Sequence, residues 1–537
     1  MARGKQKAVA APEVVTAESR YAALEGERSP YLMRARDAAK LTIPALVPPD
    51  GFHSGSVELY KPYQSVGARG INHLAAKLML ALFPPGSSFF RFRLDDYLLD
   101  ELEQQDDADG TGKQDFDSAL VRIEKAVTNR MEQKGARTDL FEALKQLLVA
   151  GNVLLEIQRD GRIRLHYLHS YVVKRDRSGN VLEIVVKEVL HRSTVPEAVR
   201  VALIAAEAQE AVASGAPETK DVDLYTRVWR DGRRWRVQQE VKGIVIPGTE
   251  GTYPLEKTAW LPLRFTKVHG EDYGRGFADE YMGDLSSLEA IRQGIVQFTG
   301  AASKILLFVN ESGTTSKRKI EQAPSGAILD GSAKDVTILQ LEKYADFQVA
   351  QTVAGEIEQN LKEAFLLHSA VQRNAERVTA EEVRYIAGEL EQALGGVYSI
   401  LAQELQLPLV IRLMAVMQRA RELPTLPDDT VSPQIVTGLD GLGRSSDLNK
   451  LDIFIAGIAQ QFGPEAVSRY VDVGAYLTRR ANALGVDVQG IIRSAEEIAA
   501  QDQAAAQQSM MEKAVAPGAA LVGKAMDVAS NEQPTGA

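Results

Sequence analysis

Two long helical patterns, separated by a polar segment, dominate the middle of the sequence. Between residues 277 and 308, apolar side chains recur every three or four positions. This spacing predicts one helix of about 25–30 residues, roughly 40 Å long. A second apolar stripe predicts another long helix from Asp346 to His368, and the intervening segment 309–345 is polar and rich in glycine. We therefore expect two long helices joined by a small polar substructure.

The first half of the chain mixes helical and strand patterns, whereas the part after residue 379 is helical. Residues 1–20 are expected to form a mobile arm and Asp95–Asp117 an exposed acidic loop. Helices are predicted at 19–41, 67–83, 116–134, 138–150 and 198–213, and strands at 153–157, 163–173, 181–189, 225–229, 235–241 and 243–246.

The segment after the second long helix carries a helix-start signal. Thr379 and Glu382 have the spacing of a capping box, in which the Thr379 hydroxyl caps a new helix and Glu382 reaches back. That helix is predicted to continue to Met417, with bends at the positions Gly388, Gly395-Gly396 and Pro408. A Pro-rich linker (423–433), a helical region (448–493) and a low-complexity tail from Gln501 complete the chain.

Composition narrows the classes of function. The formal net charge of −10 argues against a protein that binds nucleic acid with a general coat of Lys and Arg. It is compatible with a channel in which DNA slides, because each neutralised phosphate adds salt-dependent affinity. The 537 residues include no cysteine, which excludes disulfides, thiolate metal sites and cysteine nucleophiles.

Targeting and membrane signals are not expected. The stretch Met1–Ala11 is basic but lacks the apolar run of a signal peptide. The apolar stretches Leu78–Pro85 and Leu147–Ile157 are shorter than the roughly 18 residues that span a bilayer. We therefore expect a soluble chain without membrane contact.

Candidate catalytic motifs are weak. His166 and His169 lie three apart in a predicted strand, so they should point to opposite faces, which disfavours a shared metal. The run Gly518–Ala525 has the spacing of a phosphate loop, but Ala525 occupies the position of the Mg²⁺-binding hydroxyl. The acidic run 95–117 lacks the rigid scaffold of a two-metal nuclease site. We predict no catalytic residue, no cofactor and no metal.

Basic features are few. Arg373 and Arg377 bracket Asn374 in the link between two predicted helices. The cluster Lys317-Arg318-Lys319 reads as a solvated turn or a docking patch. The run Tyr225–Trp235 interleaves aromatic residues with arginines, which fits either nucleic-acid stacking or a two-faced antiparallel hairpin.

Several long blocks of the sequence resemble portal proteins of podovirus-type phages, specifically the branch that carries its own RNA polymerase. The resemblance covers roughly residues 20–500, and leaves the acidic loop, 195–222 and the tail unmatched. The blocks are YQSVGARGINHLAAKLMLALFPP (Tyr63–Pro85), LFEALKQLLVAGNVLLEI (Leu140–Ile157), SYVVKRDRSGNVLEIV (Ser170–Val185), LQLEKYADFQVA (Leu339–Ala350) and SAVQRNAERVTAEEVRYIAGELEQALGGVYSILAQELQLPLV (Ser369–Val410).

This resemblance implies an α+β, mostly helical portal fold that assembles as a twelve-fold ring. Its parts would be an α/β wing (1–273), a first stem helix (274–308), a clip (309–345), a second stem helix (346–368), a tunnel loop (369–378), a long bent wing helix (379–430), a helical crown (431–505) and a low-complexity tail (506–537).

The resemblance also gives the basic residues a role. Arg373, Arg377 and Asn374, with His368 at the edge of the loop, would face DNA phosphates in the channel, although Glu376 partly cancels the charge. The clip cluster Lys317, Arg318 and Lys319 would lie where the packaging motor and the tail adaptor dock. Thr379 and Glu382 would cap the helix after the tunnel loop.

The expected function is therefore that of a non-enzymatic portal subunit, through whose ring double-stranded DNA is packaged and ejected. The implied partners are other copies of the chain, DNA, capsid and scaffolding proteins, terminase, the tail adaptor and internal core proteins. The protein would be assembled in the host cytoplasm and reside at the portal vertex of the virion. The alternatives are another structural virion component, such as a tail adaptor, or a packaging ATPase or nuclease.

Overall fold

The computed structural model of the chain divides into two compact units. The first comprises Met1–Lys113 and Arg122–Leu439, and the second comprises Gln114–Val121 and Asp440–Ala537. The structure describes residues 15–52, 55–85, 88–94, 112–197, 200–201, 203–204, 221–302, 307–338, 344–367, 380–424, 431–436 and 443–463, and individual positions from 465 to 480.

All four helical predictions in the first 150 residues are confirmed, with small shifts at their ends. The helices are α1 (Ala17–Leu41), α2 (Val66–Leu82), α4 (Gly112–Gln133) and α5 (Ala136–Ala150). The predicted arm is helical from Ala17 onwards, because the Thr16 hydroxyl accepts a hydrogen bond from the backbone N–H of Ser19 at 3.2 Å. Helix α4 begins at Gly112, so the end of the acidic run is helix rather than loop; residues 95–111 lie outside the described part.

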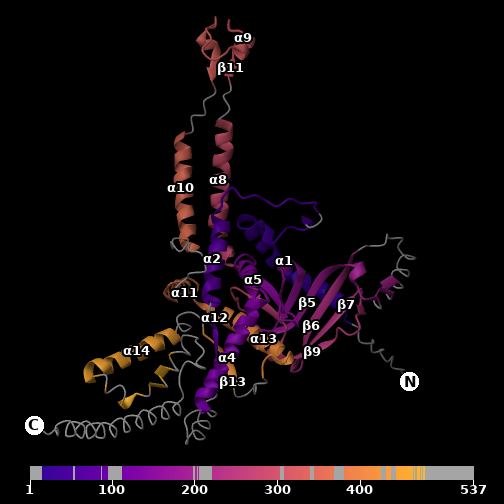
Figure 1. The fold of residues 1–537 in the computed structure, drawn as a ribbon. Coiled ribbons are helices and arrows are strands. Elements are labelled where there is room, and N and C mark those ends of the chain that lie inside the picture. Colours follow the sequence, from indigo (N-terminus) through magenta and orange to yellow (C-terminus); the bar gives the residue numbers. More distant parts are fainter. Residues whose placement is uncertain are drawn as a thin grey trace, which may run out of the picture. The chain divides into compact units, whose positions relative to one another are not determined.

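The strands between residues 152 and 264 form two antiparallel sheets, and Figure 1 labels β5, β6, β7 and β9 of the larger one. The larger has the order β4-β5-β6-β7-β8, with β9 also paired to β7. Its strands are β4 (Tyr171–Arg175), β5 (Val181–His191), β6 (Asp221–Asp231), β7 (Arg234–Val241), β8 (Ile244–Val245) and β9 (Gly251–Pro254). The smaller has the order β10-β2-β3, formed by β10 (Trp260–Arg264), β2 (Asn152–Ile157) and β3 (Ile163–His166).

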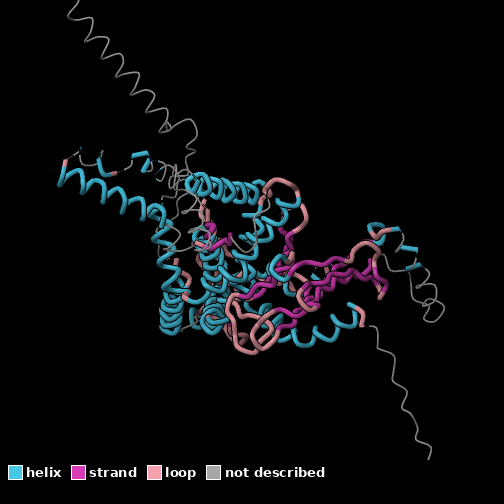
Figure 2. Tube along the Cα trace, turned by 90° about the horizontal axis from the view of Figure 1, so that it is seen from below, coloured by secondary structure: helices cyan, strands magenta, loops and turns pink. Residues whose placement is uncertain are grey.

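Helix α1 covers one face of the larger sheet. Tyr21 and Leu24 are buried against Val172, Val185 and Tyr225. Figure 2 shows the strands of this sheet (magenta) extending away from the main group of helices (cyan) of the first unit. The burial of Val222, Leu224, Thr226 and Val228 at every second position explains why the pattern of β6 was readable in the sequence, whereas β5 buries four consecutive residues, 183–186.

The single strand predicted at 163–173 is wrong. It is two strands in different sheets, separated by a 3₁₀ turn at Leu168–Ser170. The carbonyl of His169 accepts hydrogen bonds from the Tyr21 hydroxyl (3.2 Å) and from Arg28 Nη1 (2.8 Å), which hold the turn against α1. Apolar alternation continues through the turn, so the pattern does not reveal it. The helix predicted at 198–213 falls mostly outside the described residues.

The change of sequence character near residue 274 marks a close backbone crossing. Gly151 ends α5 with a φ of 71°, and a Cβ added there would lie 2.3 Å from the backbone carbon of Arg275. Asn152 secures the crossing, because its side chain donates to the Gly274 carbonyl at 2.8 Å and accepts from the Gly274 N–H at 2.7 Å. Only glycine fits at position 151.

The two long helices lie side by side (Figure 1). They are α8 (Met282–Ala302) and α10 (Tyr344–Ala364). The first is shorter than predicted, because a separate turn of helix, α7 (Phe277–Glu280), precedes it and Leu307–Val309 forms a strand, β11, rather than helix. Strand β11 pairs with β12 (Val336–Ile338), and α9 (Lys317–Gln322) lies between them in sequence. This small hairpin-based substructure matches the expected polar insertion.

The long bent helix is four pieces. They are α11 (Ala380–Leu394), α12 (Gly396–Leu401), a π-helical turn (Ala402–Gln406) and α13 (Leu407–Arg419). Gly395, with a φ of 43°, separates α11 from α12, and Pro408 lies in the first turn of α13, as expected for its missing N–H. Gly388 produces no break. The break at Gly395-Gly396 is therefore confirmed, whereas the helix continues through Gly388 and Pro408.

One described helix, Ser399–Arg419, is long and apolar enough to cross a membrane. The expectation that every apolar stretch is too short is therefore wrong. About 56% of its apolar window is buried within the protein, and core helices of globular proteins pass the same test. Its burial within the first unit accounts for its composition.

The predicted Pro-rich linker contains a strand. Val431–Ile435 forms β13, which pairs antiparallel with β1 (Phe90–Leu94) in the first unit. The region expected to be a helical crown from residue 431 thus begins with a strand, and the crown itself stays a prediction. Proline has no backbone N–H to donate across a strand pair. Pro433 is tolerated because it lies opposite Phe92, whose own N–H donates to the Glu124 carboxylate at 3.1 Å and not to β13, so no hydrogen bond crosses the pair at this position.

The second unit contains α14 (Gly443–Phe462). The Tyr476 hydroxyl donates to Asp452 of this helix at 2.6 Å, and Arg480 donates to the same hydroxyl at 2.9 Å. The helical prediction for 448–493 is confirmed up to Phe462, and the phosphate-loop-like run near residue 520 lies outside the described residues.

Candidate functional site: the base of the two long helices

An ion-pair group joins α8 to α10. Arg292 Nη2 of α8 lies 2.6 Å from Glu358 Oε2 of α10, and Lys362 Nζ lies 2.8 Å from the other oxygen of the same carboxylate. The hydrogen bonds from Lys362 and Arg292 hold the pKa of Glu358 below its usual value. Further along the pair, the rings of Phe298 and Phe347 stack with centroids 3.6 Å apart.

An aromatic cluster closes the base of the pair. Phe365, which follows α10, is fully buried and lies 5.6 Å from the Phe277 ring and 5.8 Å from the Tyr281 ring. Helix α2 contacts it through Gly70, where an added Cβ would lie 2.5 Å from Phe365 Cγ. The base is therefore built on α2, whose own apolar stripe is fully buried.

A buried carboxylate ties the chain before α2 to α8. Glu289 accepts hydrogen bonds from the Tyr60 hydroxyl (2.6 Å), the Tyr63 N–H (2.9 Å) and the Gln64 N–H (3.2 Å). The hydrogen bond to Glu289 raises the pKa of Tyr60 to about 12. Sequence reasoning missed Glu289, since a single acid on a long helix resembles a solvated residue.

A buried lysine meets both elements that flank the predicted tunnel loop. Lys77 of α2 donates to the Leu366 carbonyl at 3.1 Å, just after α10, and to Glu389 Oε2 of α11 at 2.8 Å. Its side chain is only 4% exposed. One turn earlier, burial and then the charge of Lys77 lower the pKa of His73. No local sequence signal identified this lysine, because its partners lie about 300 residues away.

The predicted channel residues fall in an undescribed segment. His368, Arg373, Asn374, Arg377 and Thr379 lie outside the described residues, and Glu382 belongs to α11 with its side chain undescribed. The structure describes the chain on both sides, up to Leu367 and from Ala380. The channel role and the capping box therefore stay predictions, although α11 begins at the residue that the capping box requires.

The predicted docking cluster lies on a short helix. Lys317, Arg318 and Lys319 form the first turn of α9 and are exposed. The cluster is therefore solvated, as expected, but lies on a helix and not in a loop turn, and the docking role stays a prediction. Asp335 holds this substructure together, because its Oδ2 accepts from the backbone N–H of Thr314 at 2.9 Å and from the Thr315 hydroxyl at 3.1 Å.

The other candidate residues from the sequence have structural roles. His166 is buried, lies 3.3 Å from Glu156 and packs against Trp260, whereas His169 lies in the 3₁₀ turn and not in a strand. In the part of the chain that the structure describes, no group of His, Asp and Glu could hold a metal. The run Tyr225–Trp235 is the β6–β7 hairpin, with Trp235 buried, which supports the hairpin reading.

A buried ion pair joins the π-helical turn to β10. Glu404, in the π-helical turn, pairs with Arg264 of β10, whose side chain is 2% exposed. Nearby, Gln406 donates to the Leu82 carbonyl at 2.6 Å. Burial, and then the neighbouring Arg264, lower the pKa of Arg175 to about 10. The π-turn places Glu404 and Gln406 toward two different elements, a use typical of such turns.

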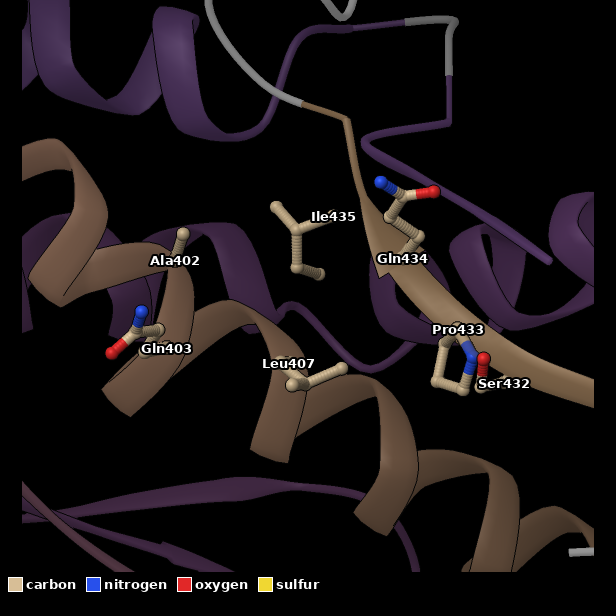
Figure 3. Close-up of a pocket in the computed structure, with 7 residues that line it drawn as sticks. All are labelled: Ala402, Gln403, Leu407, Ser432, Pro433, Gln434 and Ile435. Atoms are coloured by element: carbon tan, nitrogen blue, oxygen red, sulfur yellow. The ribbon is translucent and has the colours of Figure 1, made fainter. Parts of the chain in front are cut away.

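A shallow pocket of about 340 Å³ lies beside the same turn (Figure 3). Ala402, Gln403 and Leu407 line it from the helical side, and Ser432–Ile435 of β13 line it from the other. It contains no ionisable side chain. The pocket therefore offers no ionisable group for acid–base chemistry, and the Ser432 hydroxyl has no base beside it among the lining residues.

The sequence family described as bacteriophage head to tail connecting protein matches residues 15–492. The chain belongs to this family. The portal protein of Escherichia phage T7 is 41% identical over 525 residues, covering 96% of this chain and 95% of that protein. The portal protein of Enterobacteria phage T3 is 41% identical over 529 residues (97% and 96%), and that of Enterobacteria phage SP6 is 32% identical over 497 residues (91% and 93%).

Among solved structures, the neck of an empty gene transfer agent particle aligns with 79% of this connector chain and 90% of that chain. The sequence identity is 11% and the TM-score is 0.35. This likeness is too distant to define the fold.

Proposed function

We propose that this connector-family chain is the portal subunit of a short-tailed phage, and that twelve copies form the ring through which double-stranded DNA enters and leaves the capsid. The observation that carries the proposal is the 41% identity to the T7 portal protein over nearly the whole of both chains. A heterologous interface repeated around an axis closes into a ring.

In this ring, α8 and α10 are the stem, and the residues between α10 and α11 are the tunnel loop. Leu367 and Ala380 bound a segment of twelve residues that contains Arg373, Asn374 and Arg377, with His368 at its start. Ring symmetry repeats each arginine around the channel. Repeated positive charge facing phosphates supplies the salt-dependent contact that sliding DNA requires without base recognition.

The substructure between β11 and β12 is the clip, where terminase docks during packaging and the tail adaptor docks afterwards. The exposed residues Lys317, Arg318 and Lys319 offer positive charge to these partners. The wing faces the capsid and scaffolding proteins, the crown faces the internal core proteins, and the mature protein resides in the virion. The relatives' shared name, portal protein, supports a structural and not an enzymatic role.

The double variant Arg373→Ala/Arg377→Ala tests the tunnel-loop assignment. We expect rings with unchanged symmetry by cryo-electron microscopy, and at least a several-fold loss of DNA-filled heads, because the channel loses its phosphate contacts. The matched control is Arg177→Ala/Arg233→Ala, which removes two exposed wing arginines. Normal DNA-filled heads from the tunnel variant would contradict the assignment, and absence of rings from the unmodified chain would contradict the portal proposal itself.

A further inference from the structure

Arg412 of α13 carries a positive charge that is largely removed from water. The residue is 9% exposed, and no carboxylate among the described residues pairs with it. Its guanidinium carbon lies 5.0 Å from the centre of the Tyr253 ring of β9, and its Nη1 donates to the Lys257 carbonyl at 3.5 Å, just after β9 (Figure 1). Its Nε is buried without a hydrogen-bond partner. A buried cation is normally paired, so this arginine lacks the anion that its charge needs.

Two further arginines lie close to Arg412. Arg419 follows it by nearly two turns of α13 and therefore lies on the same side of the helix. Arg159 lies in the turn between β2 and β3, which touches α13, because a Cβ added at Gly161 would lie 3.8 Å from Leu413 Cδ2. Burial, and then the charges of Arg419 and Arg159, lower the pKa of Arg412. The three guanidinium groups therefore repel one another across a short distance.

The carboxylates of the same region pair with other arginines. Asp160 Oδ2 lies 3.2 Å from Arg162 Nε in the β2–β3 turn, and Glu422 Oε1, just after α13, lies 3.2 Å from Arg130 Nη2 of α4. The two exposed arginines beside Arg412 have no carboxylate partner in the described part of the chain. Three positive charges are therefore left without a described counter-charge, in a chain whose formal net charge is −10.

The chemistry of the group favours a phosphate as the missing anion. A guanidinium is planar, stays charged, and donates pairs of N–H groups to oxyanions. A carboxylate has one charge and two oxygens in a plane, which one arginine can satisfy. A phosphate monoanion or dianion offers acceptor oxygens in several directions and can be contacted by arginines from a turn and a helix together. The Tyr253 ring holds Arg412 in place by a cation–π contact, so one donor is already oriented.

We propose that Arg159, Arg412 and Arg419 form a binding site for a phosphate group, supplied either by free phosphate or by the backbone of a nucleic acid. Arg412 is the fixed, half of the site nearest the core, and the two exposed arginines contact the anion from the solvent side. The site lies within one chain and outside the predicted tunnel loop. The inference therefore goes beyond the proposed function and holds whether or not the chain forms a ring.

Equilibrium dialysis of the full chain against radiolabelled inorganic phosphate, at constant ionic strength, tests the site. We expect Arg412→Met to abolish binding. Arg159→Gln and Arg419→Gln should each weaken it about tenfold, because each removes a hydrogen bond between charged groups. The matched control is Arg230→Gln on β6, which removes an exposed arginine that donates only to the Gly232 carbonyl, and it should leave the affinity unchanged.

Unfolding in urea separates loss of the anion from loss of the fold. Phosphate should raise the urea midpoint of the wild type and of Arg230→Gln, and leave that of Arg412→Met unchanged, because a ligand stabilises only the protein that binds it. If Arg412→Met does not fold, the double variant Arg159→Gln/Arg419→Gln decides, since both side chains are exposed. Phosphate binding that persists undiminished in that double variant, or no binding by the unmodified chain, would overturn the inference.

Competition identifies the source of the phosphate. A short DNA duplex that displaces phosphate, with a salt dependence that falls by about one unit of slope for each arginine removed, would assign the site to a nucleic-acid backbone. A duplex that leaves phosphate bound would assign it to free phosphate. A polyglutamate peptide that displaces labelled phosphate at lower concentration than either the duplex or unlabelled phosphate would show that the arginines select carboxylates, and would overturn the phosphate assignment.

Discussion

The two halves of the α8–α10 pair are held by different forces. In the basal half, the buried Phe365 cluster, the Glu289 carboxylate and the Lys77 ammonium connect the helices to α2 and α11. In the distal half, residues 293–302 and 347–355 contain no charged side chain. There, the stacked rings of Phe298 and Phe347 join α8 to α10.

This difference indicates which half a partner would cover in the proposed ring. Val296, Val349 and Val353 of the distal half are 53%, 64% and 39% exposed, although nearby positions are uncharged. Exposed valines without charges around them resemble the core of a protein–protein interface. In the proposed ring, a neighbouring copy would cover this half, whereas the base is complete within one chain.

The largest expected effect comes from one substitution made in each half. Gly70→Ala places a Cβ 2.5 Å from Phe365 Cγ, whereas nothing lies within 4 Å of a Cβ at Gly294 in α8. Alanine favours a helix by about 0.5–1 kcal/mol over glycine, and overpacking a core costs about 1–3 kcal/mol or more. We expect Gly70→Ala to lower the stability of the base by about 2 kcal/mol and Gly294→Ala to raise that of α8, as measured by denaturant unfolding and hydrogen exchange. If Gly70→Ala stabilised the protein as Gly294→Ala is expected to, the close contact between position 70 and Phe365 would be refuted.

A smaller effect is expected from Phe298→Ala. It removes a stacked pair on a half-exposed helix, so the loss should be about 1–2 kcal/mol, with faster hydrogen exchange over residues 293–302 only. The control is Phe365→Ala, a fully buried residue whose loss should cost about 3–5 kcal/mol and should also release α7 and α2. If Phe298→Ala and Phe365→Ala gave the same hydrogen-exchange profile, the conclusion that the two halves are stabilised differently would be contradicted.

Local periodicity predicted most helices, because burial of one face leaves a repeat of 3.6 residues in the sequence. The stripes of α2, α8 and α10 were readable for this reason. Two failures have one cause. The turn at Leu168–Ser170 and the pairing of β13 with β1 depend on contacts with distant segments. Apolar alternation continues through the turn at Leu168–Ser170, so the pattern predicts one strand. Pro433 lies within β13, so the sequence there predicts a linker.

The site was predicted less well than the fold. The helical start at Ala380 followed from the capping-box spacing, and the exposure of Lys317–Lys319 followed from local charge. By contrast, Glu289 and Lys77 acquire their roles from partners about 225 to 310 residues away. Since a buried charge has no local signature, the residues that hold the base together could only emerge from the structure.

The smallest effect is expected at the boundary between the halves, from Arg292→Gln. Arg292 and Glu358 are 35% and 21% exposed, and Glu358 keeps Lys362, so the loss should stay below about 1 kcal/mol and shrink with added salt. The pKa of Glu358 is held below its ordinary 4.5, so this stabilisation is present above that pH and is lost as the pH falls through the lowered pKa. Unfolding of the wild type, Arg292→Gln, Glu358→Gln and the double variant at pH 7 and over a descending pH series measures the coupling, while NMR of the Glu358 carboxyl follows its protonation. A coupling that persists where that carboxyl is protonated would mean that Arg292 acts through packing of its stem and not through its charge, and the boundary would then belong to the apolar distal half.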